Sequence, residues 1–438
     1  MNLDEFSKKR VLVIGDIMLD KHLHGEVSRI SPEAPVPILK VNQETYNPGG
    51  AGNLASNLSA LGAKVYVGGI VGNDEAQRKL FEIFENNNID TSCILKSNKP
   101  TTQKIRGMSR QHLFRIDYED TQNIDEQEEE KLLFMIKNKI RDIDAILLSD
   151  YNKGTLTENL ITNIIKLAKE NNKLVTADCK PKNFSFYKDL DLLKPNEKEA
   201  FEMAKVSDIE EAGKIISENL NSHVIITRGN EGMSIFERNK IPKHIPARAK
   251  QVYDVSGAGD TVLATLTLSL LVGNSLEESA KLANEAASIV VSKPGVVTLT
   301  LDELRLALSP SIKTVSKVWG EEQWIENNSK YCGKRLFIKK DHYSSYHMHK
   351  NKEETFYVLE GELEIIHNGK HLRLLPEETL KLNTNEYHSF RALQDTTFFE
   401  FSTQHTDEDN YRLTKSNKGS HEQWRKEIEE ILQNVSQN

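Results

Sequence analysis

The sequence predicts an α/β domain built on a mostly parallel sheet, followed by a smaller all-β domain. Over roughly the first 300 residues, short apolar runs alternate with amphipathic helical patterns. This alternation is typical of a parallel sheet with helices on both faces. Further along, the pattern changes to closely spaced short strands, as in a small barrel or sandwich. A chain of 438 residues is also too long for one ordinary core.

Most expected strands of the first domain end at polar residues. They are residues 11–14, 65–71, 145–148, 174–177 and 224–226. Helices are expected between them, for example at residues 53–61, 160–170 and 209–220. Ligands of such sheets usually bind at the carboxyl ends of the strands. We therefore expect the functional site of this domain at that edge.

The second domain is expected to contain strands at residues 334–340, 355–367, 371–375 and 397–402. Asn368-Gly369 separates two of them and is a strong signal for a two-residue hairpin. Residues 421–432 have the pattern of an amphipathic helix. With a polar connection near residues 308–311, we expect domains at 1–309 and 316–415, and a C-terminal helix and tail at 416–438.

Composition argues against several classes of protein. A net charge of -8 gives no electrostatic reason to bind nucleic acid or an anionic membrane. No apolar run is long enough to span a bilayer, and the charged residues 1–10 do not fit a signal peptide. Three widely separated cysteines fit a reducing cytoplasm. We expect a cytoplasmic protein without nucleic-acid or membrane partners.

The segment from Asp254 to Thr261 places glycines beside an acid, ahead of a helical pattern at residues 260–271. Gly257-Ala258-Gly259 would let backbone N–H groups approach an anion, and a helix N-terminus adds partial positive charge. Asp260 could then take a proton from a hydroxyl while the amides hold a phosphoryl group. Taken alone, the segment could equally be a plain helix start with Asp260 as its capping residue.

Several stretches, in order, carry a resemblance to a known family. Residues 254–261 resemble the second signature of the ribokinase-like (PfkB) sugar kinases, and residues 48–55 resemble the first. Asn196 to Glu199 matches the family's N-x-x-E motif, and Thr227 to Gly232 matches its T-x-G-x-x-G turn. The resemblance implies an α/β ribokinase-like fold with a small β lid, and a kinase that uses ATP and Mg²⁺.

The resemblance also implies residue roles. Asp260 would deprotonate the acceptor hydroxyl, with Gly257, Ala258 and Gly259 as the anion hole. The nucleotide side would comprise Asn196, Glu199, Thr227, Gly229, Gly232 and Asn284. The sugar side would comprise Asp20, Arg29, Gly49, Gly50, Asn53 and Lys180. Alternatively, Asp20 could be only a turn residue that does not bind the sugar.

A closer resemblance concerns the sugar. Residues 25–37, 149–154 and 252–255 are similar to bacterial heptose 7-phosphate kinases, which act on the anomeric hydroxyl of D-glycero-β-D-manno-heptose 7-phosphate. The implied product is the 1,7-bisphosphate, and the implied partner is a small-molecule sugar phosphate. Residues 178–181 depart from the usual Asp-Pro-Lys-Gly, so that loop must differ. The cations available for the distal phosphate are Arg29, Lys104, Arg106, Arg110, Lys153, Lys180 and Lys182.

The second domain carries a candidate metal site. His347 and His349 share one face of a strand, and Glu354 and Gly361 follow, so the spacing H-x-H-x4-E-x6-G matches the first cupin motif. His388 would complete the set for a divalent transition metal such as Zn, Mn, Fe or Ni. Asp341 and Asn385 stand where cupins usually have glycine. The alternative is a metal-free barrel whose histidines only pack or hydrogen-bond.

The role of the second domain stays open at this level. Residues 318–322 and 331–334 resemble sugar-isomerase-type cupins, so the domain could interconvert sugar phosphates or epimerise them. It could equally be a non-catalytic sugar-binding or dimerising module. For the whole chain, the alternatives are a sugar sensor that lost turnover and a kinase for an unphosphorylated sugar or nucleoside. Both domain types favour a homodimer.

Overall fold

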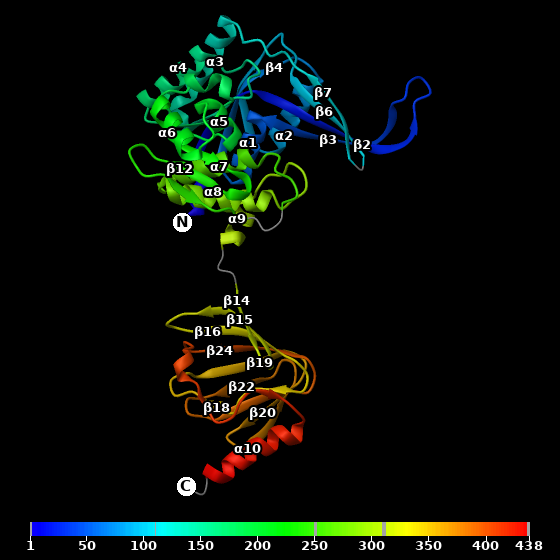
Figure 1. Ribbon diagram of the computed structural model, residues 1–438, viewed down its shortest axis with the longest axis vertical. Coiled ribbons are helices and arrows are strands. Elements are labelled where there is room, and N and C mark those ends of the chain that lie inside the picture. The colour runs from blue at the N-terminus through cyan, green and yellow to red at the C-terminus, as the bar shows by residue number, and fades with distance from the viewer. Residues whose placement is uncertain (1, 110, 249–251, 309–311, 436–438) are drawn as a thin grey trace. The chain divides into compact units, whose positions relative to one another are not determined.

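The chain forms two compact units, Met1–Ser309 and Pro310–Asn438, called here the N-terminal unit and the C-terminal unit (Figure 1). The structure is a computed structural model that describes residues 2–109, 111–248, 252–308 and 312–435. Ser309, Pro310 and Ser311 of the expected connection lie outside the described residues.

The N-terminal unit is built on one nine-stranded sheet. Its order is β13 (Lys243–Ile245), β12 (Met233–Phe236), β11 (His223–Thr227), β10 (Leu192–Leu193), β9 (Leu174–Asp178), β8 (Ala145–Ser149), β1 (Arg10–Gly15), β4 (Lys64–Val71) and β5 (Ile89–Lys96). Neighbours are parallel except where β12 pairs with β11 and β13. The predicted mostly parallel sheet is confirmed.

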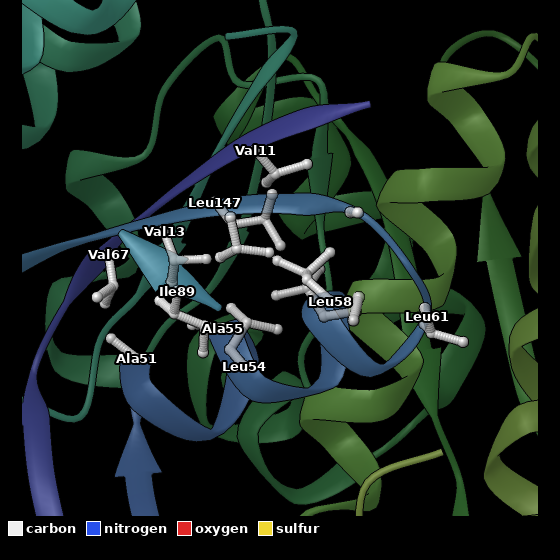
Figure 2. Close-up of a cluster of buried hydrophobic side chains, with 14 of the residues drawn as sticks. Val11, Val13, Ala51, Leu54, Ala55, Leu58, Leu61, Val67, Ile89 and Leu147 are labelled. Atoms are coloured by element: carbon white, nitrogen blue, oxygen red, sulfur yellow. The ribbon is translucent and has the colours of Figure 1, made fainter. Parts of the chain in front are cut away.

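Helices cover both faces of this sheet, because successive strand residues point to opposite faces. Val11 and Val13 of β1 join one buried cluster, and Leu12 and Ile14 join another. The first cluster receives side chains from α1 (Ala51–Ala60), α2 (Glu75–Asn86), α7 (Ala258–Leu271), α8 (Leu276–Val290) and α9 (Leu301–Leu308). Figure 2 shows part of this cluster, with Leu54, Ala55 and Leu58 of α1 beside Val11 and Val13 of β1. The second receives them from α3 (Glu126–Lys139), α4 (Glu158–Glu170), α5 (Glu197–Ala204) and α6 (Ile209–Leu220).

A second, four-stranded sheet belongs to the same unit. Its order is β3 (Pro37–Gly50), β2 (Ile17–Ile30), β6 (Thr102–Met108) and β7 (His112–Tyr118). The inner end of β2 is buried at Ile17 to Leu19, and its outer end is exposed. In Figure 1 the blue ribbons of β2 and β3 reach away from the helices. This sheet is the small lid that the sequence predicts.

The C-terminal unit packs two antiparallel sheets around one apolar cluster. The first contains β14 (Lys313–Lys317), β15 (Gly320–Asn327), β16 (Cys332–Ile338), β24 (Thr396–Ser402), β19 (Glu354–Glu360) and β22 (Thr379–Leu382). The second contains β21 (Lys370–Leu374), β20 (Leu363–His367), β23 (His388–Ala392), β17 (His342–Tyr343), β26 (Asn417–Lys418), β18 (His347–Met348) and β25 (Tyr411–Arg412). Helix α10 (His421–Val435) contributes Trp424 and Ile428 to a further buried cluster.

One expected strand of this unit, residues 355–367, is wrong as a single element. The chain breaks at Gly361, whose φ of +92° is a conformation that favours glycine. As a result β19 and β20 belong to different sheets. The hairpin at Asn368-Gly369 is confirmed, because β20 pairs with β21 and both turn residues have positive φ, +48° and +77°.

Two further features bear on function. Among the described residues, no helix is long and apolar enough to cross a membrane. All three tryptophans of the chain, Trp319, Trp324 and Trp424, lie in the C-terminal unit.

Candidate active site and candidate metal centre

Asp260 lies in the first turn of α7, at the buried contact between α7 and α1. The helix begins after Gly257, which has a φ of +79° and makes no side-chain cap. The suggestion that Asp260 caps the helix is therefore wrong. Its carboxylate is only 6% exposed and accepts a hydrogen bond of 2.5 Å from Asn53 Nδ2 of α1. A second bond, from Thr261 Oγ1 to Asn57 Oδ1 at 2.7 Å, fixes the two helices together.

The surroundings of Asp260 shift the pKa of its carboxyl toward neutral pH. Burial raises the pKa of Asp260 to about 6, while the hydrogen bond from Asn53 lowers it and the charge of Asp178 raises it. The carboxylate is therefore largely ionised at neutral pH and still accepts a proton readily.

Lys194 is a site residue that the sequence reasoning missed. It follows β10, is 2% exposed, and its Nζ lies 2.8 Å from Asp178 Oδ2. Burial opposes its charge, but Asp178 outweighs burial and raises the pKa of Lys194. A Cβ atom at Gly259 would stand 3.3 Å from this ammonium, so the glycine permits a close approach. The available signal was a lysine at the end of a buried run, two residues before Asn196.

Gly49 and Gly50, at the end of β3 just before α1, lie close to the Asp20 side chain of β2 and to the backbone of Asp16, between β1 and β2. Asp20 accepts a hydrogen bond from Arg106 of β6. A Cβ at Gly49 would come within 2.5 Å of Asp20 Oδ2, and a Cβ at Gly50 within 2.3 Å of the Asp16 carbonyl oxygen. Arg29, by contrast, lies on the exposed outer end of β2. The structure thus brings Asp20 and the glycines together and places Arg29 farther along the lid.

Tyr151 links these groups and was also missed as a site residue. Lys104 Nζ and Lys180 Nζ lie 5.6 and 5.1 Å from the centre of its ring. The charge of Asp260 and burial both raise the pKa of Tyr151 well above its usual range, so the phenol lies near that carboxylate. Lys104 comes from β6 of the four-stranded sheet and Lys180 from the loop after β9, so the two cations are brought together only in the folded chain.

The predicted nucleotide residues gather at the carboxyl ends of β10 and β11. Asn196 and Glu199 form a reciprocal capping box at the start of α5, and Glu199 Oε1 also accepts from Lys180 Nζ at 2.6 Å. Asn196 forms a parallel bridge to Thr227. Gly232 has a φ of +90°, and a Cβ there would come within 2.0 Å of the Ile245 carbonyl oxygen.

The remaining predicted residues of this side lie at its margins. Gly229 is exposed, with a φ of +54°. Asn284 of α8 is buried and donates to the Pro246 carbonyl at 2.8 Å. Arg110, one candidate for the distal phosphate, lies outside the described residues. The loop at residues 178–181, which differs from the usual Asp-Pro-Lys-Gly, continues from Pro181 into a 3-10 helix, Pro181–Phe186.

Three histidines of the C-terminal unit form a candidate metal centre. One ring nitrogen from each of His347, His349 and His388 lies within 4.8 Å of the others. In each ring, Nδ1 donates to a backbone carbonyl: that of Ser345 at 2.8 Å, of Asp409 at 2.5 Å and of Glu386 at 3.1 Å, respectively. The three Nε2 atoms therefore carry lone pairs, the form in which imidazole binds a metal.

Glu354 shows that a cation fits this centre. Its Oε1 lies 2.7 Å from His388 Nε2 and 3.7 Å from His349 Nε2. Oε1 and His388 Nε2 are both buried without a hydrogen-bond partner. Two facing lone pairs at that distance need a cation or an extra proton between them. Three imidazoles and one carboxylate suit a divalent transition metal, so the donor set fits the predicted group.

The positions that depart from the cupin motif keep the glycine conformation. Asp341 and Asn385 have φ of +61° and +63°. Asp and Asn tolerate this left-handed region better than other residues with a Cβ. The substitutions therefore preserve the backbone conformation just before β17 and β23.

The candidate metal centre opens into a cavity of about 440 Å³, called here the C-terminal cavity. Its wall contains buried charged side chains in addition to the three histidines and Glu354 of the candidate metal centre. These are Glu322, Lys334, Lys352 and Glu400. Cations also line the cavity at Lys317, Arg412 and Lys415. A pocket with buried acids and bases beside a metal set is suited to a small polar ligand.

The fold and the Asp260 site together define a carbohydrate kinase domain, and the chain belongs to the pfkB family carbohydrate kinases, which it matches over residues 8–303. Residues 336–400 match the Cupin domain.

Curated relatives named "Bifunctional protein HldE" are similar to the chain. That of Caulobacter sp. strain K31 is 42% identical over 308 residues, which are 68% of this chain and 62% of the relative. That of Psychromonas ingrahamii is 40% identical over 74% of this chain and 68% of the relative. That of Helicobacter pylori strain Shi470 is 38% identical over 75% of this chain and 72% of the relative. The chain thus spans less than two thirds of the first relative's length.

Solved structures show the same fold at low identity. Arabidopsis thaliana ribokinase, complexed with ribose and ATP, has a TM-score of 0.56 and 19% identity, covering 69% of this chain and 99% of that one. The tetrameric inhibited form of Escherichia coli phosphofructokinase-2 has a TM-score of 0.57 and 17% identity, covering 68% and 97%. The predicted ribokinase-like fold is confirmed.

Proposed function

We propose that the N-terminal unit transfers a phosphoryl group from ATP to the anomeric hydroxyl of a heptose 7-phosphate, giving the 1,7-bisphosphate. The carrying observation is the buried base Asp260, held by Asn53 at the start of a helix and close to Lys194. A sensor that had lost turnover would have no need to keep this ionisable group buried.

Each chemical task has a side chain in place. Asp260 takes the hydroxyl proton, because its pKa of about 6 leaves it ionised at neutral pH. Lys194 supplies positive charge beside Gly259, where negative charge grows on the transferred group. Asn196 and Glu199 would hold the Mg²⁺ and phosphate side, and Mg²⁺ favours such oxygen ligands. We place this enzyme in the cytoplasm, as a homodimer.

The choice of a phosphorylated sugar rests on the cations around Tyr151. Lys104, Arg106 and Lys180 lie near the base and the sugar-side residue Asp20. Burial lowers the pKa of Lys104, which marks a desolvated ammonium that an incoming phosphate would stabilise. An unphosphorylated sugar offers no such partner.

A coupled ADP-release assay across hexoses and heptoses, each with and without a 6- or 7-phosphate, tests this proposal. We expect the highest kcat/KM for the heptose 7-phosphate and loss of turnover in Asp260→Asn, with ATP binding retained. Equal kcat/KM with and without the distal phosphate would contradict the substrate class, and near-normal turnover in Asp260→Asn would contradict the base.

A second proposal concerns the C-terminal unit, which we infer interconverts or epimerises a sugar phosphate. The supporting observation is the combination of three free Nε2 atoms with buried acids and bases around one cavity. A bound divalent cation would polarise a carbonyl and hydroxyl pair. The alternative is a non-catalytic sugar-binding module. Incubating the metal-loaded chain, without ATP, with sedoheptulose 7-phosphate or mannose 6-phosphate distinguishes them, since only the enzyme gives a new isomer.

A further inference from the structure

The C-terminal cavity contains more buried charge than a metal set requires. Lys334, Lys352, Glu322 and Glu400 are each at most 9% exposed, and all four line the cavity. Burying an ion pair costs desolvation that its mutual attraction barely offsets, so such pairs are weak evidence of a role in stability. Because these charges line a cavity, a role in binding or converting a ligand is the better explanation.

Two of these charges, Lys334 and Glu400, lie opposite each other on paired strands of the barrel. Lys334 of β16 is paired with Glu400 of β24, and two residues along the same strands Leu336 is paired with Phe398. Because side chains alternate with period two, both pairs face inward. On these two strands the interior is therefore charged at one level and apolar at the next. On β19 the residue paired with Glu400 is Phe356, and Glu354 lies one inward-facing step further along the strand, paired with Ser402.

Lys352 connects the Lys334–Glu400 pair to the candidate metal centre. Its Nζ lies 2.5 Å from Glu354 Oε2 and 2.6 Å from Glu400 Oε1. The ammonium of Lys352 thus lies between Glu400 and Glu354, and only Glu354 belongs to the candidate metal centre. Burial raises the pKa of Glu400, but Lys352 and Lys334 outweigh burial and lower it overall. Glu400 is therefore an ionised carboxylate, able to accept a proton.

We propose that Glu400 is the carboxylate that moves a proton between adjacent carbons of a sugar phosphate in the C-terminal cavity. The inference rests on the function proposed above for this unit. It assigns Lys352 a positioning role, since that ammonium fixes the distance between Glu400 and Glu354.

The proposed step needs no further reagent. From an aldose, Glu400 takes the proton of carbon 2; that C–H electron pair becomes the double bond between carbons 1 and 2, and the carbonyl oxygen on carbon 1 gains a proton. The hydroxyl on carbon 2 then loses its proton and becomes the carbonyl, while carbon 1 takes the proton from Glu400. The proton lost by one oxygen balances that gained by the other, so substrate and product are isomers.

The test uses the full chain loaded with Mn²⁺ and incubated with sedoheptulose 7-phosphate or mannose 6-phosphate in D₂O. Deuterium entering at carbon 1 or 2 is followed by NMR, and Mn²⁺ stoichiometry is measured separately. We expect Glu400→Gln to lower deuterium incorporation at least about 100-fold. Mn²⁺ content, and the change in water-proton relaxation when the sugar phosphate is added, should stay as in the unaltered chain. The matched control is Glu326→Gln, which alters an exposed carboxylate of β15 and should leave deuterium incorporation unchanged.

The outcomes separate the two ideas. If the unaltered chain exchanges no proton with either sugar phosphate, the function proposed for this unit fails, and this inference with it. If the chain exchanges and Glu400→Gln stays within about threefold of it, only the role of Glu400 fails. If Glu400→Gln loses Mn²⁺, Glu400→Asp decides: bound Mn²⁺ with exchange reduced at least about tenfold supports the role, and lost Mn²⁺ or undiminished exchange overturns it.

Discussion

Asp260 owes its chemical character to where it lies rather than to what it is. An exposed aspartate has a pKa of about 3.9, whereas burial raises the pKa of Asp260 to about 6, which makes its carboxylate a stronger base. The activity should therefore fall as the pH drops below about 6, because the protonated carboxyl cannot accept the hydroxyl proton. The measurement is the pH profile of kcat/KM for phosphoryl transfer.

The second ionisation of a sugar phosphate lies in the same pH region, so a control variant is needed. The hydrogen bond from Asn53 lowers the pKa of Asp260, and Asn53→Ala removes it. The acid limb should then move to higher pH, although the substrate is unchanged. An acid limb that stays at the same pH in Asn53→Ala would show that it arises from ionisation of the substrate phosphate.

Lys104 offers a second test at the scale of one residue. If it binds the distal phosphate, Lys104→Ala should lower kcat/KM for the heptose 7-phosphate by about 10- to 100-fold, the value of a charged hydrogen bond. The same variant should change turnover of the unphosphorylated heptose little. Lys182→Ala, which alters an exposed cation in the 3-10 helix after Lys180, is the matched control. Equal losses with both sugars would remove Lys104 from phosphate recognition.

At the scale of elements, Gly361 decides how the barrel closes. Its φ is +92°, and a Cβ added there would stand only 2.5 Å from Thr396 Oγ1, so the position leaves no room for a side chain. We expect Gly361→Ala to destabilise the C-terminal unit by about 2–4 kcal/mol, from left-handed strain and overpacking. Thermal unfolding of the unit measures this. Gly333→Ala, where a Cβ meets nothing within 4 Å, should shift the midpoint little.

The sequence predicts elements better than it predicts their meeting points. Apolar runs and caps are local, so α6 falls at the residues expected and β1 within one residue of them. The split at Gly361 was missed because one glycine inside an apolar run does not say which sheet each half joins. Lys194 and Tyr151 were missed for a related reason: their roles arise from Asp178, Lys104 and Lys180, which come from separate strands and loops.

At the scale of the whole molecule, metal should stabilise one unit. A cation that binds only the folded state at about 100 times its Kd adds about 2.7 kcal/mol. For a unit of this size, chelation should therefore lower the calorimetric midpoint of the C-terminal unit by roughly 10 °C. His347→Ala, which removes a donor, should abolish the difference between chelated and Mn²⁺-loaded protein. A midpoint that is unchanged by chelation would contradict the metal centre.

The confinement of Trp319, Trp324 and Trp424 to the C-terminal unit has a practical consequence. Tryptophan fluorescence therefore reports on that unit alone, because the sequence of the N-terminal unit contains no tryptophan. Two of these rings sit at informative places: Trp319 lines the C-terminal cavity, and Trp324 lies under the ammonium of Lys334. The chain thus carries an optical probe of its cavity that needs no label, and quenching by Mn²⁺ or by a sugar phosphate can be followed while ATP is present.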